Sequence, residues 1–87
     1  MRGYIGLLVR PVKEFSVDVC LFPGYPLGTH RYTPDDVFVV EHDFRDNGEG
    51  DGIHLGCPNG DWMAMTGQRF SEVFGERALQ RLEGLIA

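Results

Sequence analysis

Hydrophobic and polar residues alternate in three segments of the chain, and this alternation predicts antiparallel β-strands. Residues 4–12 alternate weakly and end near Pro11, whereas residues 15–22 alternate well, with their apolar side chains on one face. Residues 37–44, rich in Val and Phe, form the clearest predicted strand. That strand ends in polar residues as it runs toward solvent: Glu41, His42 and Asp43.

A hairpin is predicted over residues 53–66, where two apolar runs flank Pro58-Asn59-Gly60. A turn with Pro58 at its second position and a left-handed Gly60 requires no N–H from the proline. This register pairs Leu55 with Met63. It gives one apolar face made of Ile53, Leu55, Met63 and Met65 and places Trp62 on the other face, half exposed and near His54.

The two remaining long segments are predicted to be a loop and a helix. Residues 22–36 contain three prolines and two glycines, which favour an unusually long loop. From Ser71, a plausible N-cap, the period becomes helical over about 71–86. The apolar stripe of this helix is expected to dock on the sheet; it consists of Phe74, Ala78, Leu79, Leu82, Leu85 and Ile86.

The size of the chain predicts one domain over residues 1–87. Its longest apolar runs are shorter than the roughly 20 residues of a membrane span, and the N-terminal run has no small-residue cleavage site, so we expect a cytoplasmic protein without a membrane association. Only two cysteines occur, Cys20 and Cys57, and we expect both to be reduced.

Negative charge is concentrated in the middle of the sequence. Residues 35–61 carry a net charge of −7 and the rest of the chain sums to +2, for a total of −5. This distribution argues against direct nucleic-acid binding. The carboxylates of the segment are Asp35, Asp36, Glu41, Asp43, Asp46, Glu49, Asp51 and Asp61, opposed only by Arg45.

Residues 37–74 resemble the central part of small SH3-like β-barrel proteins of bacteria and their phages. The features that carry the resemblance are Phe38 to Val40, the turns Asp51-Gly52 and Asn59-Gly60, Trp62, and the closing segment Arg69-Phe70-Ser71-Glu72-Val73. The resemblance implies a mainly β fold, a small SH3-like antiparallel β-barrel of about five strands, here followed by the C-terminal α-helix. It contains no catalytic motif.

Metal binding is not predicted. The acidic DNGEGDG turn places Pro58 where a calcium loop beginning at Asn47 needs its closing carboxylate. His54 and Cys57 lie three apart on one strand and so point to opposite faces, which does not suit a zinc site. We therefore expect no metal and no cofactor.

Catalysis is also not predicted, because the same geometry separates His54 from Cys57 and no other nucleophile stands beside a base. The sequence leaves one alternative open: a small metal-dependent or carboxylate-based enzyme that uses His42, His54 and nearby acids.

The function expected from the sequence is that of a non-enzymatic, acidic protein-interaction module. Aromatic side chains beside acidic ones suit an interface with a basic partner protein, although a merely solvated acidic surface is the alternative. Together with the resemblance, this implies a phage-encoded inhibitor, similar to an anti-CRISPR protein, that occupies a basic or nucleic-acid-binding surface of a host protein. The oligomeric state stays open. The predicted partner-binding residues are Tyr25, Tyr32, Asp46, Glu49, Asp51 and Trp62.

Overall fold

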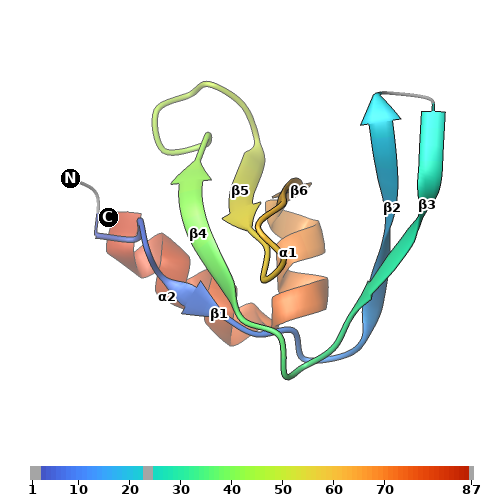
Figure 1. The fold of residues 1–87 in the computed structure, drawn as a ribbon. Coiled ribbons are helices and arrows are strands. Elements are labelled where there is room, and N and C mark those ends of the chain that lie inside the picture. Colours follow the sequence, from blue (N-terminus) through green and yellow to red (C-terminus); the bar gives the residue numbers. More distant parts are fainter. Residues whose placement is uncertain (1–2, 23–24, 87) are drawn as a thin grey trace.

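The computed structural model describes residues 3–22 and 25–86, without the side chains of residues 19–22 and 25–27. A four-stranded antiparallel sheet has the order β1-β4-β5-β6, and β2 and β3 form a separate two-stranded hairpin. Figure 1 shows this hairpin as an arm beside the sheet. The elements are β1 (Leu8–Val9), β2 (Phe15–Phe22), β3 (Tyr25–Tyr32), β4 (Phe38–Asp43), β5 (Gly52–Gly56), β6 (Trp62–Thr66), α1 (Gly67–Phe74) and α2 (Glu76–Ile86).

The prediction of a mainly β chain with antiparallel pairing and a C-terminal helical region is confirmed. Both sheets are open: in the part of the chain that the structure describes, no strand pairing joins β2–β3 to the four-stranded sheet. The strand expected over residues 4–12 pairs only at Leu8 and Val9. Before it, residues 3–6 form a turn in which Leu7 N–H donates to the Tyr4 carbonyl over 3.0 Å.

The predicted loop over residues 22–36 is wrong for most of its length, because Tyr25–Tyr32 forms β3. Two features let a proline-containing segment pair here. In a two-stranded hairpin each strand has one edge that needs no hydrogen-bond partner, and Pro26 lies beside the register shifts around Cys20. Tyr32 therefore lies at the end of a strand and not on a loop.

The β5–β6 hairpin has the predicted register. Leu55 lies opposite Met63 and Gly56 lies opposite Trp62. The turn closes with Gly60 N–H donating to the Cys57 carbonyl over 3.0 Å, and Gly60 has the expected positive φ of 90°. Ile53 and Leu55 are buried, and Met63 and Met65 are partly buried against the core, so the predicted apolar face is also confirmed.

The single helix expected over 71–86 is instead two helices. α1 begins earlier, where the Thr66 hydroxyl accepts from Arg69 N–H over 3.1 Å, so Thr66 and not Ser71 is the N-cap. Gly75, with φ of 96°, ends α1 and separates it from α2. Phe74 and Leu82 are buried as expected, but Leu85 is 45% exposed because the break rotates α2 relative to α1.

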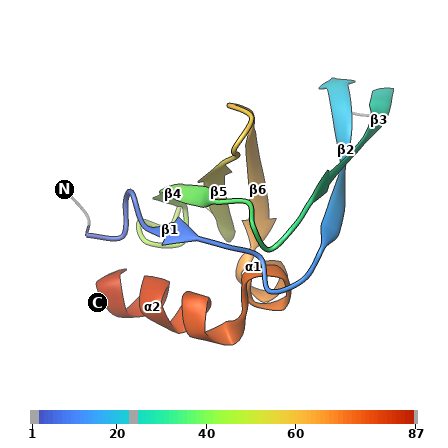
Figure 2. The same ribbon diagram turned by 60° about the horizontal axis from the view of Figure 1, so that its bottom comes forward.

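The core lies between the four-stranded sheet and the helices, which cover one side of the sheet (Figure 2). Phe38 on β4 is its centre: its ring centroid lies 4.9 Å from that of Tyr32, 5.2 Å from Phe74 and 5.9 Å from Phe15. Tyr32 and Phe15 pair at the base of the β2–β3 arm. The arm is therefore anchored to the core through its base.

A partly buried ion pair connects the sheet to the helices. Asp43 is 0% exposed and accepts from Arg45 Nε at 3.0 Å and Arg45 Nη2 at 2.8 Å. Arg45 Nη1 also lies 3.5 Å from Glu83 Oε1 on α2. The expectation that Asp43 runs toward solvent is wrong, because a register shift between Val40 and His42 reverses the alternation at the end of β4.

Candidate functional site: an aromatic surface and an acidic cleft

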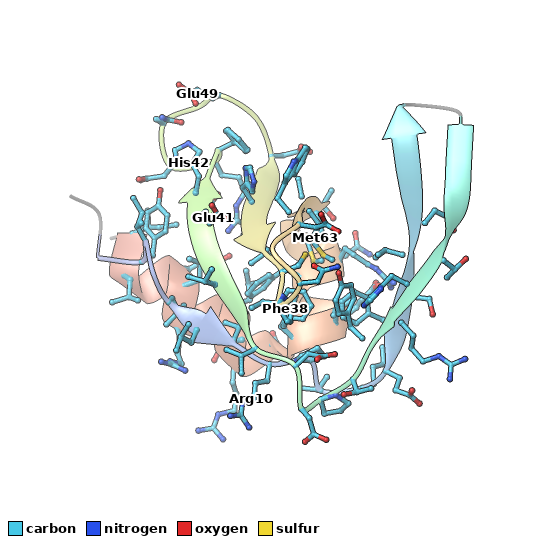
Figure 3. The ribbon with its side chains drawn as sticks, in the orientation of Figure 1. Arg10, Phe38, Glu41, His42, Glu49 and Met63 are labelled. Atoms are coloured by element: carbon cyan, nitrogen blue, oxygen red, sulfur yellow. The ribbon has the colours of Figure 1, made fainter. Side chains whose placement is uncertain are left out.

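Four aromatic or imidazole rings form a continuous row on the outward face of the four-stranded sheet. His42 and His54 lie opposite each other on β4 and β5. The ring centroids of His42 and Phe44 are 4.5 Å apart, those of Phe44 and His54 are 6.2 Å apart, and those of His54 and Trp62 are 4.9 Å apart. We call these residues the ring row; Figure 3 shows side chains on this part of the sheet.

Local sequence explains why Trp62 stands out from the sheet. It lies opposite Gly56, which offers no side chain to pack against. The space above Gly56 is taken by Glu41 instead, since a Cβ at Gly56 would lie 2.5 Å from Glu41 Oε1. Trp62 is consequently 68% exposed, more than the half exposure expected from the hairpin register. A large aromatic side chain this exposed is a frequent anchor of protein interfaces.

The acidic β4–β5 turn meets one end of the ring row. Glu49 Oε2 lies 3.6 Å from His42 Nε2, and the backbone of Glu49 is fixed by its N–H donating to the Phe44 carbonyl over 2.9 Å. Asp51 is exposed nearby in the sequence. Figure 3 places Glu49 at the tip of this turn, above His42. The turn therefore adds exposed negative charge to one end of an aromatic surface.

A cleft of about 280 Å³ lies at the other end of the ring row, between the β2–β3 arm and the β5–β6 hairpin. Aromatic, acidic and apolar side chains line it in close proximity. Trp62 belongs to both the ring row and this cleft. We call it the acidic cleft; its lining residues are Val17, Asp18, Tyr32, Cys57, Asp61, Trp62 and Met63.

Burial raises the pKa of two of the lining groups, both of which are neutral around pH 7. Loss of solvent raises the pKa of the Tyr32 hydroxyl to about 12, and its hydrogen bond to Cys57 adds to the shift. Loss of solvent also raises the pKa of the Cys57 thiol; the hydrogen bond with Tyr32 opposes this rise, and the negative charge of Asp61 adds to it. Around pH 7 the charge of the lining residues therefore comes from the carboxylates of Asp18 and Asp61. An aromatic wall beside two carboxylates suits a cationic side chain.

The structure brings three of the predicted partner-binding residues onto this connected surface: Glu49, Trp62 and Tyr32. A fourth, Asp51, is exposed in the same turn as Glu49. Tyr32 is only 3% exposed, so it forms a wall of the cleft and not an exposed anchor. Asp46 has different surroundings, because its Oδ2 accepts from the buried Tyr4 hydroxyl over 3.1 Å. The side chain of Tyr25 lies outside the described residues.

Sequence reasoning missed Asp18, Asp61 and Cys57 as members of a site. Asp18 lies on the polar face of a well-alternating strand, which marks its exposure. Asp61 belongs to the turn, where its Oδ2 accepts from Asn59 Nδ2 over 3.1 Å. What the sequence could not supply is the approach of β2–β3 to β6, which forms the cleft.

The negative charges of residues 35–61 do not share one face. Asp35 and Asp36 lie in the β3–β4 connection, at the opposite end of the molecule from the β4–β5 turn (Figure 1). Asp36 Oδ2 accepts from Thr33 N–H over 2.8 Å, and Asp43 is buried with Arg45. The acidic surface is therefore formed by Glu49 and Asp51 at one end of the ring row and by the acidic cleft at the other.

Among the described side chains, no three of His, Cys, Asp or Glu come together in a group that could hold a metal ion. His42 and His54 face each other across two strands, but the residues lining the acidic cleft include neither of them.

Within residues 3–22 and 25–86, no helix has the length and apolar character to cross a membrane. Comparison of the chain with family models, curated protein sequences and solved structures finds no match.

Proposed function

We propose that this protein is a non-enzymatic interaction module that binds a basic segment of a partner protein. The observation that carries the proposal is the position of Trp62, which is largely exposed and joins the ring row to the acidic cleft. A lysine or arginine side chain in the cleft would contact the rings of Trp62 and Tyr32 and meet the carboxylates of Asp18 and Asp61. Glu49 and Asp51 would steer the partner toward the surface.

In its most specific form, the proposal is a phage-encoded inhibitor, the function that the resemblance to small SH3-like β-barrel proteins of bacteria and phages suggests. The module would act in the cytoplasm and cover a basic or nucleic-acid-binding surface of a host protein, such as a CRISPR effector. Support for this form comes from the placement of acidic and aromatic groups and from the resemblance of residues 37–74. We further propose that the fold derives from an SH3-like barrel, supported by the β4–β5–β6 meander and its predicted turns.

The chain carries its own reporter for this proposal, because Trp62 is its single tryptophan. An oligoarginine peptide and an oligolysine peptide should change the emission of Trp62 on titration, with saturation and with an affinity that falls as salt rises. Asp18→Asn should weaken binding about tenfold, the value of one charge-assisted contact. The matched control is Asp35→Asn, which removes the same charge at an exposed residue outside the lining of the cleft.

Equal loss of affinity in Asp18→Asn and Asp35→Asn would mean that the peptides respond to net charge alone, and the cleft would then have no specific role. An unchanged Trp62 emission with both peptides would also contradict the proposal. Circular dichroism and thermal melts of both variants verify that each is folded, so that a loss of binding is not a loss of structure.

A further inference from the structure

A second hollow, larger than the acidic cleft, lies between β1 and α2 and has a volume of about 560 Å³. It shares no lining residue with the acidic cleft. Apolar side chains from both elements and from Val37 form part of the lining, and arginines complete it. We call it the arginine groove; its lining residues are Leu8, Val9, Arg10, Val37, Phe74, Arg77, Ala78 and Arg81.

The arginines of this groove differ from the other arginines of the described chain. Arg31 lies 3.9 Å from Glu14, Arg45 lies 2.8 Å from Asp43, and Arg69 lies 3.4 Å from Glu72. Within the described residues, the guanidinium groups of the groove form no such pair, and no residue lining the groove carries a carboxylate. Three exposed positive charges therefore surround an apolar lining: Arg10, Arg77 and Arg81.

This arrangement is unfavourable for the isolated protein. Arg77 and Arg81 are four residues apart on α2, a spacing at which like charges repel and destabilise a helix. Leu8 is 61% exposed on a strand at the edge of the sheet, where its side chain meets water. Both costs would be relieved by an occupant that brings carboxylates to the arginines and an apolar side chain to Leu8.

We propose that the arginine groove is a docking site for an acidic segment of a partner protein, one in which carboxylates flank apolar residues. Charge complementarity argues for carboxylates, since Arg guanidinium groups bind them in a bidentate manner. A protein segment is favoured over a nucleic acid because the groove is partly apolar and because the chain as a whole is negative, at −5, which repels a long polyanion. The figures place this groove away from the acidic turn: Arg10 and Glu49 lie at opposite ends of the molecule (Figure 3).

The inference goes beyond the proposed function, because it gives the protein a second binding surface of opposite charge. A module of this kind would join a basic partner at the acidic cleft to an acidic partner at the arginine groove. Neither surface needs the other to be occupied, since they have no residue in common. The proposal for either surface can therefore be contradicted without contradicting the proposal for the other.

The test uses a short fluorescein-labelled peptide of alternating glutamate and leucine, followed by fluorescence anisotropy on the full chain. The double variant Arg77→Gln/Arg81→Gln should weaken binding at least about tenfold. The matched control Arg31→Gln/Arg69→Gln removes the same two charges outside the groove and should bind like the parent protein. Thermal melts should show the groove variant as stable as the parent or more so, because the repulsion on α2 is removed.

Two further probes decide the chemistry of the occupant. A peptide with glutamine in place of each glutamate should not bind; equal binding would mean that the groove recognises apolar groups alone, and the proposal would be wrong. A single-stranded oligonucleotide of similar length should bind more weakly than the acidic peptide; tighter binding would reassign the groove to nucleic acid. Equal affinity of the two double variants, or no binding of the acidic peptide, would likewise overturn the proposal.

Discussion

Asp43 and Arg45 show how a shift in strand register changes the environment of a side chain. In strict alternation the end of β4 would direct Asp43 toward water, and its carboxylate would be one more surface charge. The register shift between Val40 and His42 turns it inward, where Arg45 binds both of its oxygens. A β-bulge of this kind leaves no dependable mark in a single sequence, so neither the burial of Asp43 nor its role could be predicted.

Removing the charge of Asp43 should be costly, because Arg45 would lose its bidentate partner in a partly buried site. We expect Asp43→Asn to lower the free energy of unfolding by about 3 kcal/mol, measured by urea denaturation. The control Asp51→Asn removes an exposed carboxylate and should change it by less than about 0.5 kcal/mol. A similar stability for both variants would mean that the ion pair does not hold the sheet to the helices.

Tyr32 and Cys57 give the protein a pH dependence on the alkaline side. The pKa of Tyr32 rises from 10.0 to about 12 on folding, and that of Cys57 rises above its usual 9.0. Both groups lose their protons first in the unfolded chain, so the unfolded state binds fewer protons and stability falls as the pH rises. Below about pH 8 neither group contributes to the pH dependence.

We therefore expect the free energy of unfolding to decline between about pH 9 and 12, by up to about 2 kcal/mol from Tyr32. Denaturant titrations at a series of pH values measure this. Tyr32→Phe should have a shallower decline above pH 10, with part retained because burial also raises the pKa of Tyr4. A decline as steep as that of the parent protein would show that Tyr32 does not cause it.

At the scale of elements, prediction succeeded where local chemistry selects one arrangement. Pro58 and Gly60 fix the β5–β6 register, because only one turn satisfies both. It failed at β3, where proline content favoured a loop but a hairpin edge tolerates proline. It failed also at Gly75, since an apolar stripe with helical spacing runs through the break.

The two glycines of the helical region should respond in opposite ways to the same substitution. Gly75 has φ of 96° and ψ of 150°, and a Cβ there would lie 3.0 Å from Val12 Cγ1, so Gly75→Ala should lower stability by about 2 kcal/mol. Gly84 lies within α2 with nothing near its Cβ position, so Gly84→Ala should raise stability by roughly 0.5–1 kcal/mol. Urea denaturation measures both changes, and destabilisation by Gly84→Ala would contradict the helix over Glu76–Ile86.

At the scale of the whole molecule, the candidate surfaces depend on contacts between segments far apart in sequence. The acidic cleft needs the β2–β3 arm beside β6, and the arginine groove needs β1 beside α2. Alternation and turn chemistry predict individual strands, but they do not state which sheets stay open or how an arm is placed. For the same reason the sequence predicted Glu49 and Trp62 as partner-binding residues but could not place Asp18 beside Trp62.

At the acidic surface, charge should mainly affect the association rate of a partner, and aromatic contact should mainly affect its dissociation rate. Glu49→Gln/Asp51→Asn removes two exposed carboxylates of the β4–β5 turn, and the 3.6 Å pair of Glu49 with His42 is too exposed to hold the fold. With an oligoarginine peptide this variant should associate several-fold more slowly at low salt, with a flatter salt dependence and little change in dissociation. The control Asp35→Asn/Glu72→Gln removes equal charge elsewhere and should associate nearly as the parent does.

Trp62→Ala should have the complementary effect. Its association rate should stay close to that of the parent, because the charge is unchanged. Its dissociation should be faster, with a loss of about 2 kcal/mol of binding free energy, if the ring covers the bound cation. Surface plasmon resonance at a series of salt concentrations resolves both rates. If the turn variant associates as fast as the parent at low salt, the carboxylates of the turn are only solvated surface. If Trp62→Ala dissociates at the parental rate, Trp62 does not anchor a partner at the acidic cleft. If the turn steers the partner and the Trp62 ring contacts it, the turn variant must change association and Trp62→Ala must change dissociation.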